Sequence, residues 1–349
     1  MHQLELPALR ADDPLGFLAA LGVLELTTAA LPAKPRLHWK GPAGAAVLTT
    51  DRPLTLDTLT ELLTSHLPPK PAQRSKKKVN GEERENPAAA VDPLPYAPGL
   101  LTISRDDDPT ARNDALRMRL DANHDLLRRL ARAEREDGSH LARWLASLTN
   151  SMCFREFTPD TKTGGSGNRV VRRTRTTPLI ATSGRMTLTI VMQKAVEGCH
   201  QDPLQIRSAL TGWRRIPEYA PANLDHRALG DAHTNPEGEA YQRGAPGPAW
   251  LALHALGTFR LTAIGRTEAA TSWDTTDGGA LRWPAWTPPL TTTAVTVLLE
   301  HPAVRTPEPG TSRNARMLTN LGVTALYTAP RTGTSKYASP LAAGRPLWP

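Results

Sequence analysis

The amino-acid sequence predicts an α+β fold, in which mixed helices and short strands are joined by long basic loops rich in proline and glycine. Three observations lead to this class. Apolar residues recur at helical spacing in some stretches and form short runs bounded by turn residues in others, without a regular β-α-β alternation. No internal repeat is visible. The 349 residues include 32 prolines, about twice the ordinary share, which predicts unusually long connections.

The first helix is expected to begin at Asp12-Asp13-Pro14. An aspartate caps the free amides of a helix, and proline fits the first turn. The apolar residues of 15–26 supply a broad buried surface, and Gly16 and Gly22 permit close approach by another element. Two short strands and a second helix should follow, at 36–39, 46–49 and 56–66.

The remaining elements follow the same periodicities. A long polar helix with one apolar seam is expected at 110–136, and WPAW at 283–286 is interpreted as a structural corner with buried rings. Further helices are expected at 140–150, 186–197, 204–214, 250–256, 294–300 and 313–320. Further strands are expected at 100–104, 258–264 and 323–327. The predicted regions are an N-terminal α/β segment at 1–67, a flexible basic Pro-rich loop at 68–99, a helical and basic-loop region at 100–215 and a C-terminal α+β region at 216–349.

The composition favours a polyanionic partner. The formal net charge is +8, although charge alone does not separate nucleic acid from an acidic protein. The two cysteines, Cys153 and Cys199, are too few for a disulfide framework or a four-ligand zinc site without histidines. We therefore expect no cofactor. The sequence shows neither a signal peptide nor a segment able to span a bilayer, which predicts a soluble cytoplasmic protein without a membrane partner.

The strongest local signal is positive charge in a second expected loop at 157–178 and in the helix after it. Between Thr161 and Val196 there are seven basic residues and no acidic one. Arginine forks suit bidentate contacts to phosphate, so a nucleic-acid-binding loop that orders on contact is the functional hypothesis. The candidate residues in the loop are Lys162, Arg169, Arg172, Arg173 and Arg175. A solvated basic loop is the alternative.

Two further groups carry weaker phosphate-binding signals. Ser183 and Arg185 precede the helix expected at 186–197, where the amides of a helix start attract anions, although ordinary capping explains Ser183 equally well. The run Lys76, Lys77 and Lys78 lies in the Pro-rich loop and suits non-specific phosphate binding. Solvated charge is the alternative for this run.

A catalytic centre is harder to find. Asp225, His226, Asp231 and His233 carry oxygen and nitrogen ligands suited to a divalent metal, yet their segment lacks a rigid spacing, and an exposed loop is the better interpretation. No Walker-type phosphate loop, HExxH or GxSxG element occurs. The chain is therefore predicted not to be an enzyme, with a metal-dependent nuclease or phosphoesterase as the alternative.

Several segments resemble CRISPR-associated proteins of type I-U (also called I-G) loci. Residues 12–26, DDPLGFLAALGVLEL, resemble the "N/D-P-x-G-F-L-A-A-x-G-x-L" helix that opens those proteins. Similar segments follow in the same order as TPLIATSGR at 177–185, GAPGPAWLALHAL at 244–256 and WPAW at 283–286. Met186 follows Gly184-Arg185 where the group often carries an aromatic residue, and the resemblance does not extend to the basic stretches at 67–99 and 164–175.

This resemblance implies a divergent large-subunit-like or accessory component of a crRNA-guided type I effector complex in antiviral defence. Guide RNA, target DNA near its protospacer-adjacent motif and neighbouring backbone subunits would be the partners. The resemblance implies no catalysis by this chain. A protein scaffold whose basic loops meet acidic partner surfaces is the remaining alternative.

Overall fold

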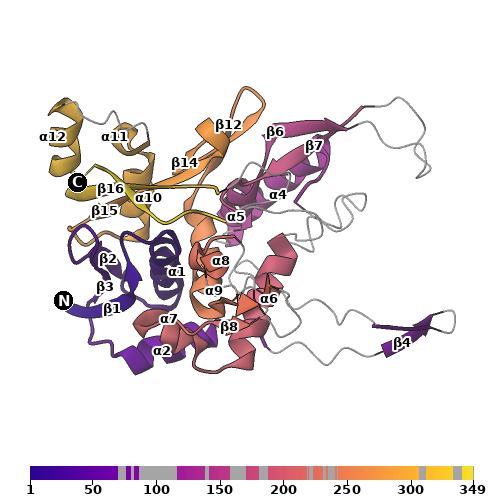
Figure 1. The fold of residues 1–349 in the computed structure, drawn as a ribbon. Coiled ribbons are helices and arrows are strands. Elements are labelled where there is room, and N and C mark those ends of the chain that lie inside the picture. Colours follow the sequence, from indigo (N-terminus) through magenta and orange to yellow (C-terminus); the bar gives the residue numbers. More distant parts are fainter. Residues whose placement is uncertain are drawn as a thin grey trace.

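The computed structural model describes residues 1–69, 76–79, 82–85, 116–137, 141–157, 170–180, 188–217, 219, 223–230, 233–234, 240–241, 243–305, 312–332 and 340–348. Helices alternate irregularly with small antiparallel sheets, which confirms the predicted α+β class (Figure 1). No helix among these residues is long and apolar enough to cross a membrane.

The helices of the described chain differ widely in length. They are α1 (Pro14–Ala30), α2 (Leu56–Ser65), α4 (Leu120–Asp137), α5 (Leu141–Leu148), α6 (Leu188–Gln201), α7 (Gln205–Thr211), α8 (Arg227–Gly230), α9 (Pro246–His254), α10 (Thr292–Glu300), α11 (Pro302–Arg305) and α12 (Ser312–Asn320), with 3-10 turns η3 (Ala255–Thr258) and η4 (Thr276–Gly278). The helix predicted at 110–136 is thus described from Leu120, and the one predicted at 250–256 begins earlier, at Pro246.

The strands form two larger sheets and several hairpins. They are β1 (His2–Arg10), β2 (Arg36–Trp39), β3 (Ala45–Thr50), β4 (Lys76–Val79), β5 (Glu82–Glu85), β6 (Thr149–Phe157), β7 (Val171–Thr176), β8 (Ile216–Pro217), β9 (His233–Thr234), β10 (Ala240–Tyr241), β11 (Arg243–Gly244), β12 (Leu261–Ile264), β13 (Thr267–Ala270), β14 (Trp273–Asp274), β15 (Ala280–Trp286), β16 (Val323–Pro330) and β17 (Arg345–Trp348). One sheet has the order β1-β3-β2, and the other has the order β14-β15-β16-β17.

Helix α1 begins where its sequence predicts. The Asp13 side chain accepts a hydrogen bond from the Gly16 amide at 2.9 Å, and Pro14 occupies the first turn. The helix is apolar on nearly all sides and is buried along most of its length, as a helix at the centre of a core must be.

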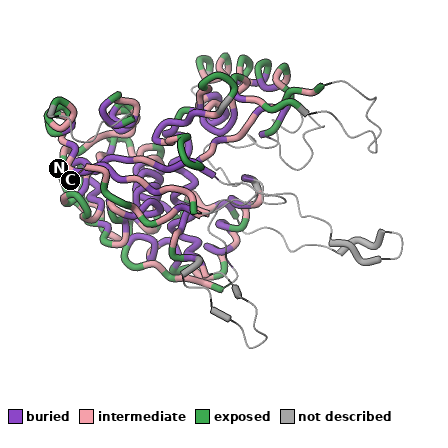
Figure 2. Tube along the Cα trace, turned by 45° about the horizontal axis from the view of Figure 1, so that its top comes forward, coloured by how far each residue is buried: buried purple, intermediate pink, exposed green. Residues whose placement is uncertain are grey.

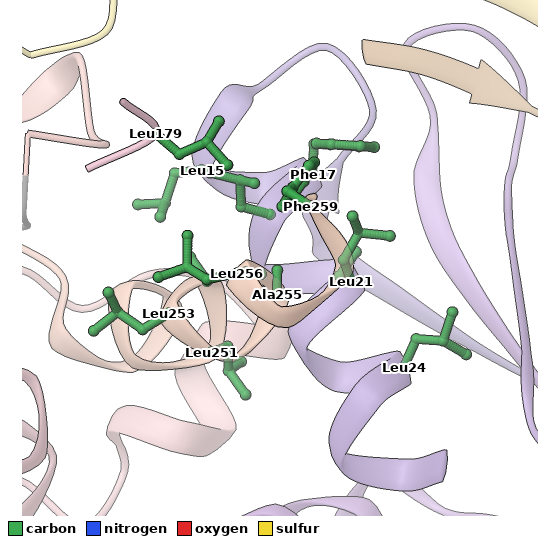
Figure 3. Packing of buried hydrophobic residues seen from close by; sticks show 14 of the residues in the cluster. Leu15, Phe17, Leu21, Leu24, Leu179, Leu251, Leu253, Ala255, Leu256 and Phe259 are labelled. Carbon is green, nitrogen blue, oxygen red and sulfur yellow. The ribbon is translucent and has the colours of Figure 1, made fainter. Parts of the chain in front are cut away.

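Helix α9 crosses α1 at very short range. A Cβ atom on Gly22 would overlap the Leu251 carbonyl group, so the two backbones touch as the sequence predicts. Leucines of α1, α9 and η3 belong to one buried cluster, including Leu21, Leu253 and Leu256 (Figure 3). The same buried cluster continues into side chains of all the larger described regions of the chain.

An aromatic cluster joins the two larger sheets to α1. Phe17 stacks on Trp39 at 6.1 Å and on Trp283 at 5.7 Å between ring centroids, and it meets the edge of Trp286. The indole of Trp283 donates to the Ala11 carbonyl at 2.7 Å, and that of Trp286 donates to the Leu37 carbonyl at 2.8 Å. The prediction that the rings of 283–286 are buried is confirmed.

The interpretation of 283–286 as a corner is wrong. These residues belong to β15, which pairs with β16 from Ala280 to Trp286. Pro284 lies beyond the two-residue strand β14, at a point where the described sheet has no partner strand on that side of β15. Proline is tolerated in a strand where its missing amide would not serve a ladder.

Two predicted loops contain strands. In the stretch predicted as a flexible loop at 68–99, β4 pairs with β5 so that Lys76 faces Glu85 and Lys78 faces Glu83. In the loop predicted at 157–178, Val171–Thr176 form β7 and pair with β6.

The buried His254 makes folding stability sensitive to pH. Burial, and then the nearby His66, lower the pKa of His254 to about 3, whereas the unfolded chain protonates this imidazole near pH 6.5. The unfolded state therefore takes up the proton first, and stability is lost as pH falls from 6.5 towards 3. We expect a loss of about 2 kcal/mol between pH 7 and pH 5 from this residue.

Urea unfolding of the wild type and of His254→Gln at both pH values checks this expectation. The variant should lose markedly less stability on acidification, whatever its stability at pH 7. The control is His124→Gln, at an exposed position of α4. It should lose as much stability on acidification as the wild type does. A variant whose pH dependence matches the wild type would contradict the assignment.

Candidate nucleic-acid interface

A basic layer formed by α4, α5, β6 and β7 is fastened to the core. Arg143 of α5 donates to Glu25 of α1 at 2.6 Å and to the Gly257 carbonyl at 2.9 Å, and Thr258 donates to the same carboxylate at 2.9 Å. The Trp144 side chain is buried beside Gly257. These contacts hold the layer against α1 and η3 while leaving its far side to solvent.

Strand β7 lies between two neighbours, and this places three arginines in a line. Arg173 of β7 faces Arg155 of β6 in the antiparallel register and faces Arg119 through a bridge on its other side. Residues at facing positions project from the same side of a sheet, with Cβ atoms about 5 Å apart. We call Arg119, Arg173 and Arg155 the arginine row.

The arginine row is accessible to solvent and its members are held in place. Arg119 and Arg155 are exposed, and Arg173 is half-buried. The Arg173 guanidinium donates to the Arg117 carbonyl at 2.9 Å, and Arg119 lies 3.2 Å from Asp121 in an ion pair open to water. Like charges at facing positions of a sheet cost stability, so the row concentrates positive charge at some expense to the fold.

Helix α4 adds positive charge to the same layer. Its inner face is buried through Asn123 and Leu126, while Arg128, Arg132 and Arg135 recur on an exposed face (Figure 2). Within the described residues 116–137, 141–157 and 170–180 there are eleven arginines, no lysines and six acidic residues. The layer is therefore strongly basic, and arginine supplies all of its positive charge other than histidine.

Arg172 and Arg175, two of the predicted phosphate contacts, are each paired with a glutamate, although the Arg172 side chain is 56% exposed. Arg172 donates to Glu156 at 3.0 Å and lies 5.4 Å from the centroid of the Phe154 ring. Arg175 is paired with Glu268 of β13 and is largely buried. Both side chains thus join β7 to its neighbours, and only Arg173 of the predicted residues in the described part of this segment belongs to the arginine row.

The structure does not describe the side chains of the other predicted phosphate contacts. Lys162, Arg169, Ser183 and Arg185 lie outside the described residues. For Lys76, Lys77 and Lys78 the structure gives the backbone of β4 and its register against the acidic strand β5. Each lysine therefore has a glutamate or Arg84 at the facing position of a two-stranded sheet, where the sequence predicts a flexible loop.

Asp225 is buried, which corrects its interpretation as part of an exposed loop. It accepts from Arg215 at 2.6 Å and from the Arg227 amide at 2.9 Å. Arg227 also lies 2.9 Å from Asp13, whose pKa is raised by burial in spite of its bond to the Gly16 amide and its attraction to Arg227. A buried carboxylate needs such partners, and these ion pairs connect the α1 N-terminus to α8.

The same segment does not assemble a metal centre within the described chain. Asp231 lies outside the described residues, and for His233 only the backbone of β9 is given. Among the residues that the structure describes, no group of three or more His, Cys, Asp or Glu side chains is placed to hold a metal ion.

The fold and the basic layer define the chain as an α+β protein with an arginine-lined surface. A scan against protein-family models found no match, and a search of curated proteins found none either. Arg119 and Arg155 were not among the sequence-predicted contacts. The alternation Arg117-Met118-Arg119, with a buried methionine between exposed arginines, is the one local pattern that marks an edge segment there.

Proposed function

We propose that this chain is a non-catalytic nucleic-acid-binding subunit that contacts the phosphate backbone through the arginine row. The supporting observation is the placement of Arg119, Arg173 and Arg155 at facing positions of adjacent backbone segments. Three such segments span about 10 Å, and a nucleic-acid strand presents a charge about every 3.4 Å along a duplex axis. The row thus meets several phosphates of one strand.

Phosphate contacts also explain why like charges are tolerated at these positions. A bound polyanion converts their mutual repulsion into attraction and releases the counterions that both partners hold. Such contacts fix position and orientation but carry no base sequence. The arginine row accordingly binds the nucleic-acid backbone, and the exposed arginines of α4 add to the affinity.

We further propose that the chain works within a crRNA-guided type I CRISPR effector complex, where guide RNA or target DNA and other subunits are its partners. The support is the position of the segments that resemble type I-U proteins. Residues 12–26 include the N-cap and the first part of α1, 244–256 include α9, and 283–286 lie in β15. These segments are packed against one another in the core. Their resemblance to type I-U proteins therefore concerns the fold, and the binding surface can differ from that of those proteins.

Fluorescence-anisotropy titrations of the purified chain test the proposal. Duplex DNA, single-stranded DNA and a structured RNA are each titrated over a series of salt concentrations. If the three arginines of the row each neutralise one phosphate, log affinity should fall as log salt concentration rises, with a slope of magnitude about 2 to 3. Each neutralised phosphate contributes about 0.7 to 0.9 to this slope. Feeble binding even at low salt would contradict autonomous nucleic-acid binding and favour an acidic protein surface as the partner.

A further inference from the structure

An aromatic and basic group of side chains lies where β6 and β7 meet the turn of the β12–β13 hairpin. The Cζ atoms of Arg172 and Arg266 lie over the Phe154 ring, at 5.4 Å and 5.2 Å from its centroid. The Glu156 carboxylate binds both guanidinium groups, with N–O distances of 3.0 Å to Arg172 and 3.4 Å to Arg266. We call Phe154, Arg172 and Arg266 the cation–π patch.

The cation–π patch is open to solvent. The side chains of Arg172 and Arg266 are 56% and 66% exposed, and Phe154 is half-buried. Much of each arginine side chain therefore faces water although its guanidinium group contacts the ring. Because the two arginines share the single carboxylate of Glu156, the group also keeps a positive charge.

Exposed apolar side chains gather in the same part of the molecule. Seven large hydrophobic side chains are exposed in the described chain, and three of them lie in β6, in β12 or directly before β7, namely Met152, Ile264 and Val170. Met152 is 64% exposed and Ile264 is 71% exposed. Apolar residues that are exposed together mark interaction surfaces, whereas single ones need no explanation.

Hydrogen bonds between β6 and β12 place Ile264 beside the cation–π patch. The Asn150 side-chain amide donates to the Leu261 carbonyl at 2.8 Å. The Cys153 thiol donates to the Thr262 carbonyl at 2.7 Å. Strand β12 therefore lies alongside β6 (Figure 1), and Ile264 follows these contacts just before the hairpin turn.

The cation–π patch and the arginine row project from opposite faces of the β6–β7 pair. Arg172 faces Glu156 in the antiparallel register, and the next facing pair is Arg173 with Arg155. Successive side chains of a strand point to opposite faces of a sheet. The patch therefore does not take the phosphates that the row would bind, and its ligand has to suit a surface that is flat, partly apolar and basic.

We propose that the cation–π patch binds unpaired bases of single-stranded nucleic acid by stacking. Bases outside a duplex stack on aromatic rings and on guanidinium planes, and their apolar faces suit exposed side chains such as Met152 and Ile264. Bases inside a duplex are already stacked on one another, so the patch selects single strands. The proposal rests on the proposed function, in which nucleic acid is the partner.

Anisotropy titrations of the full-length chain with two labelled probes test this proposal. One probe is a short oligothymidylate, and the other is an abasic strand of the same length, so both carry the same phosphates. The wild type should bind oligothymidylate at least about fivefold more tightly, which is the smallest contribution expected of one stacked base. The salt slope should be the same for both probes, because stacking neutralises no phosphate.

Two patch variants should lose most of the preference for oligothymidylate. Arg172→Lys/Arg266→Lys removes the guanidinium planes and keeps both charges, and Phe154→Leu removes the ring and keeps an apolar side chain. Affinity for the abasic strand and the salt slope should stay those of the wild type. The matched control is Arg316→Lys/Arg345→Lys, which changes exposed arginines outside the basic layer and should keep the preference. Thermal unfolding of each variant accompanies the titrations.

Equal affinity of the wild type for the two probes would overturn the stacking proposal and assign the exposed apolar side chains to a protein partner. Full preference for oligothymidylate in either patch variant that unfolds like the wild type would overturn it as well. The proposed function is tested separately, by the salt slope after loss of the arginine row. A base preference together with a slope that survives this loss would overturn phosphate binding by the row alone. Binding of neither probe at low salt would overturn both proposals.

Discussion

Replacing Gly22 by alanine is expected to destabilise the protein by about 3 kcal/mol or more. The new Cβ would overlap the Leu251 carbonyl, and a backbone group in the middle of α9 cannot move aside as the end of a flexible side chain can. Relief requires α1 and α9 to separate, which opens a close crossing inside the buried cluster. Equilibrium unfolding in urea measures the loss, and a variant too unstable to purify folded would agree with it.

The matched control for this substitution is Gly212→Ala. Gly212 ends α7, has an extended φ of 174°, and no atom approaches the position of its Cβ. We expect the free energy of unfolding to change by less than about 1 kcal/mol, and in the stabilising direction. If Gly22→Ala changed the free energy of unfolding as little as this control, the close crossing of α1 and α9 would be contradicted.

Replacing all three arginines of the row by glutamine is expected to weaken nucleic-acid binding strongly without harming the fold. Loss of three phosphate contacts should lower the salt slope by about 2 to 3 and reduce affinity at low salt by at least about tenfold. The melting temperature should change little, because relief of the facing like charges offsets the loss of the Arg173 hydrogen bond to the Arg117 carbonyl and of the Arg119–Asp121 ion pair. Anisotropy titrations and thermal unfolding of one preparation test both parts.

Arg172→Gln provides the contrast within the same strand. Arg172 is engaged with Glu156 and Phe154, so its loss removes a contact between β7 and β6 rather than a phosphate contact. We expect the salt slope to remain that of the wild type. If Arg172→Gln lowered the salt slope as much as the loss of one row arginine does, Arg172 would have to be counted among the phosphate contacts.

Local patterns in the sequence were sufficient for the helical core. Asp13 and Pro14 indicate the start of α1, and Gly22 indicates the close approach of another element, which is α9. Both features depend on single residues and can be read locally. The strand β15 was missed because Pro284 argues against a strand unless the sheet order is known. β1 was also missed, since its partner β3 lies more than thirty residues away along the chain.

The arginine row depends on longer-range strand pairing than sequence patterns reveal. Arg119, Arg155 and Arg173 become neighbours only once β7 is paired on both sides with the correct register. The partner of Arg175, Glu268, is 93 residues away, so its removal from the phosphate-binding set is visible only in the fold. Which arginines are paired with a glutamate and which lie in the arginine row therefore depends on strand register, which the sequence pattern does not carry.

The most direct measurement compares the salt slopes of two triple variants with equal net charge. One is Arg119→Gln/Arg155→Gln/Arg173→Gln, and the other is Arg52→Gln/Arg316→Gln/Arg345→Gln, which removes exposed arginines outside the basic layer. We expect a slope lower by about 2 to 3 for the row variant and a nearly unchanged slope for the control. Equal slopes in the two variants would show that net charge governs binding, and would contradict phosphate binding by the arginine row.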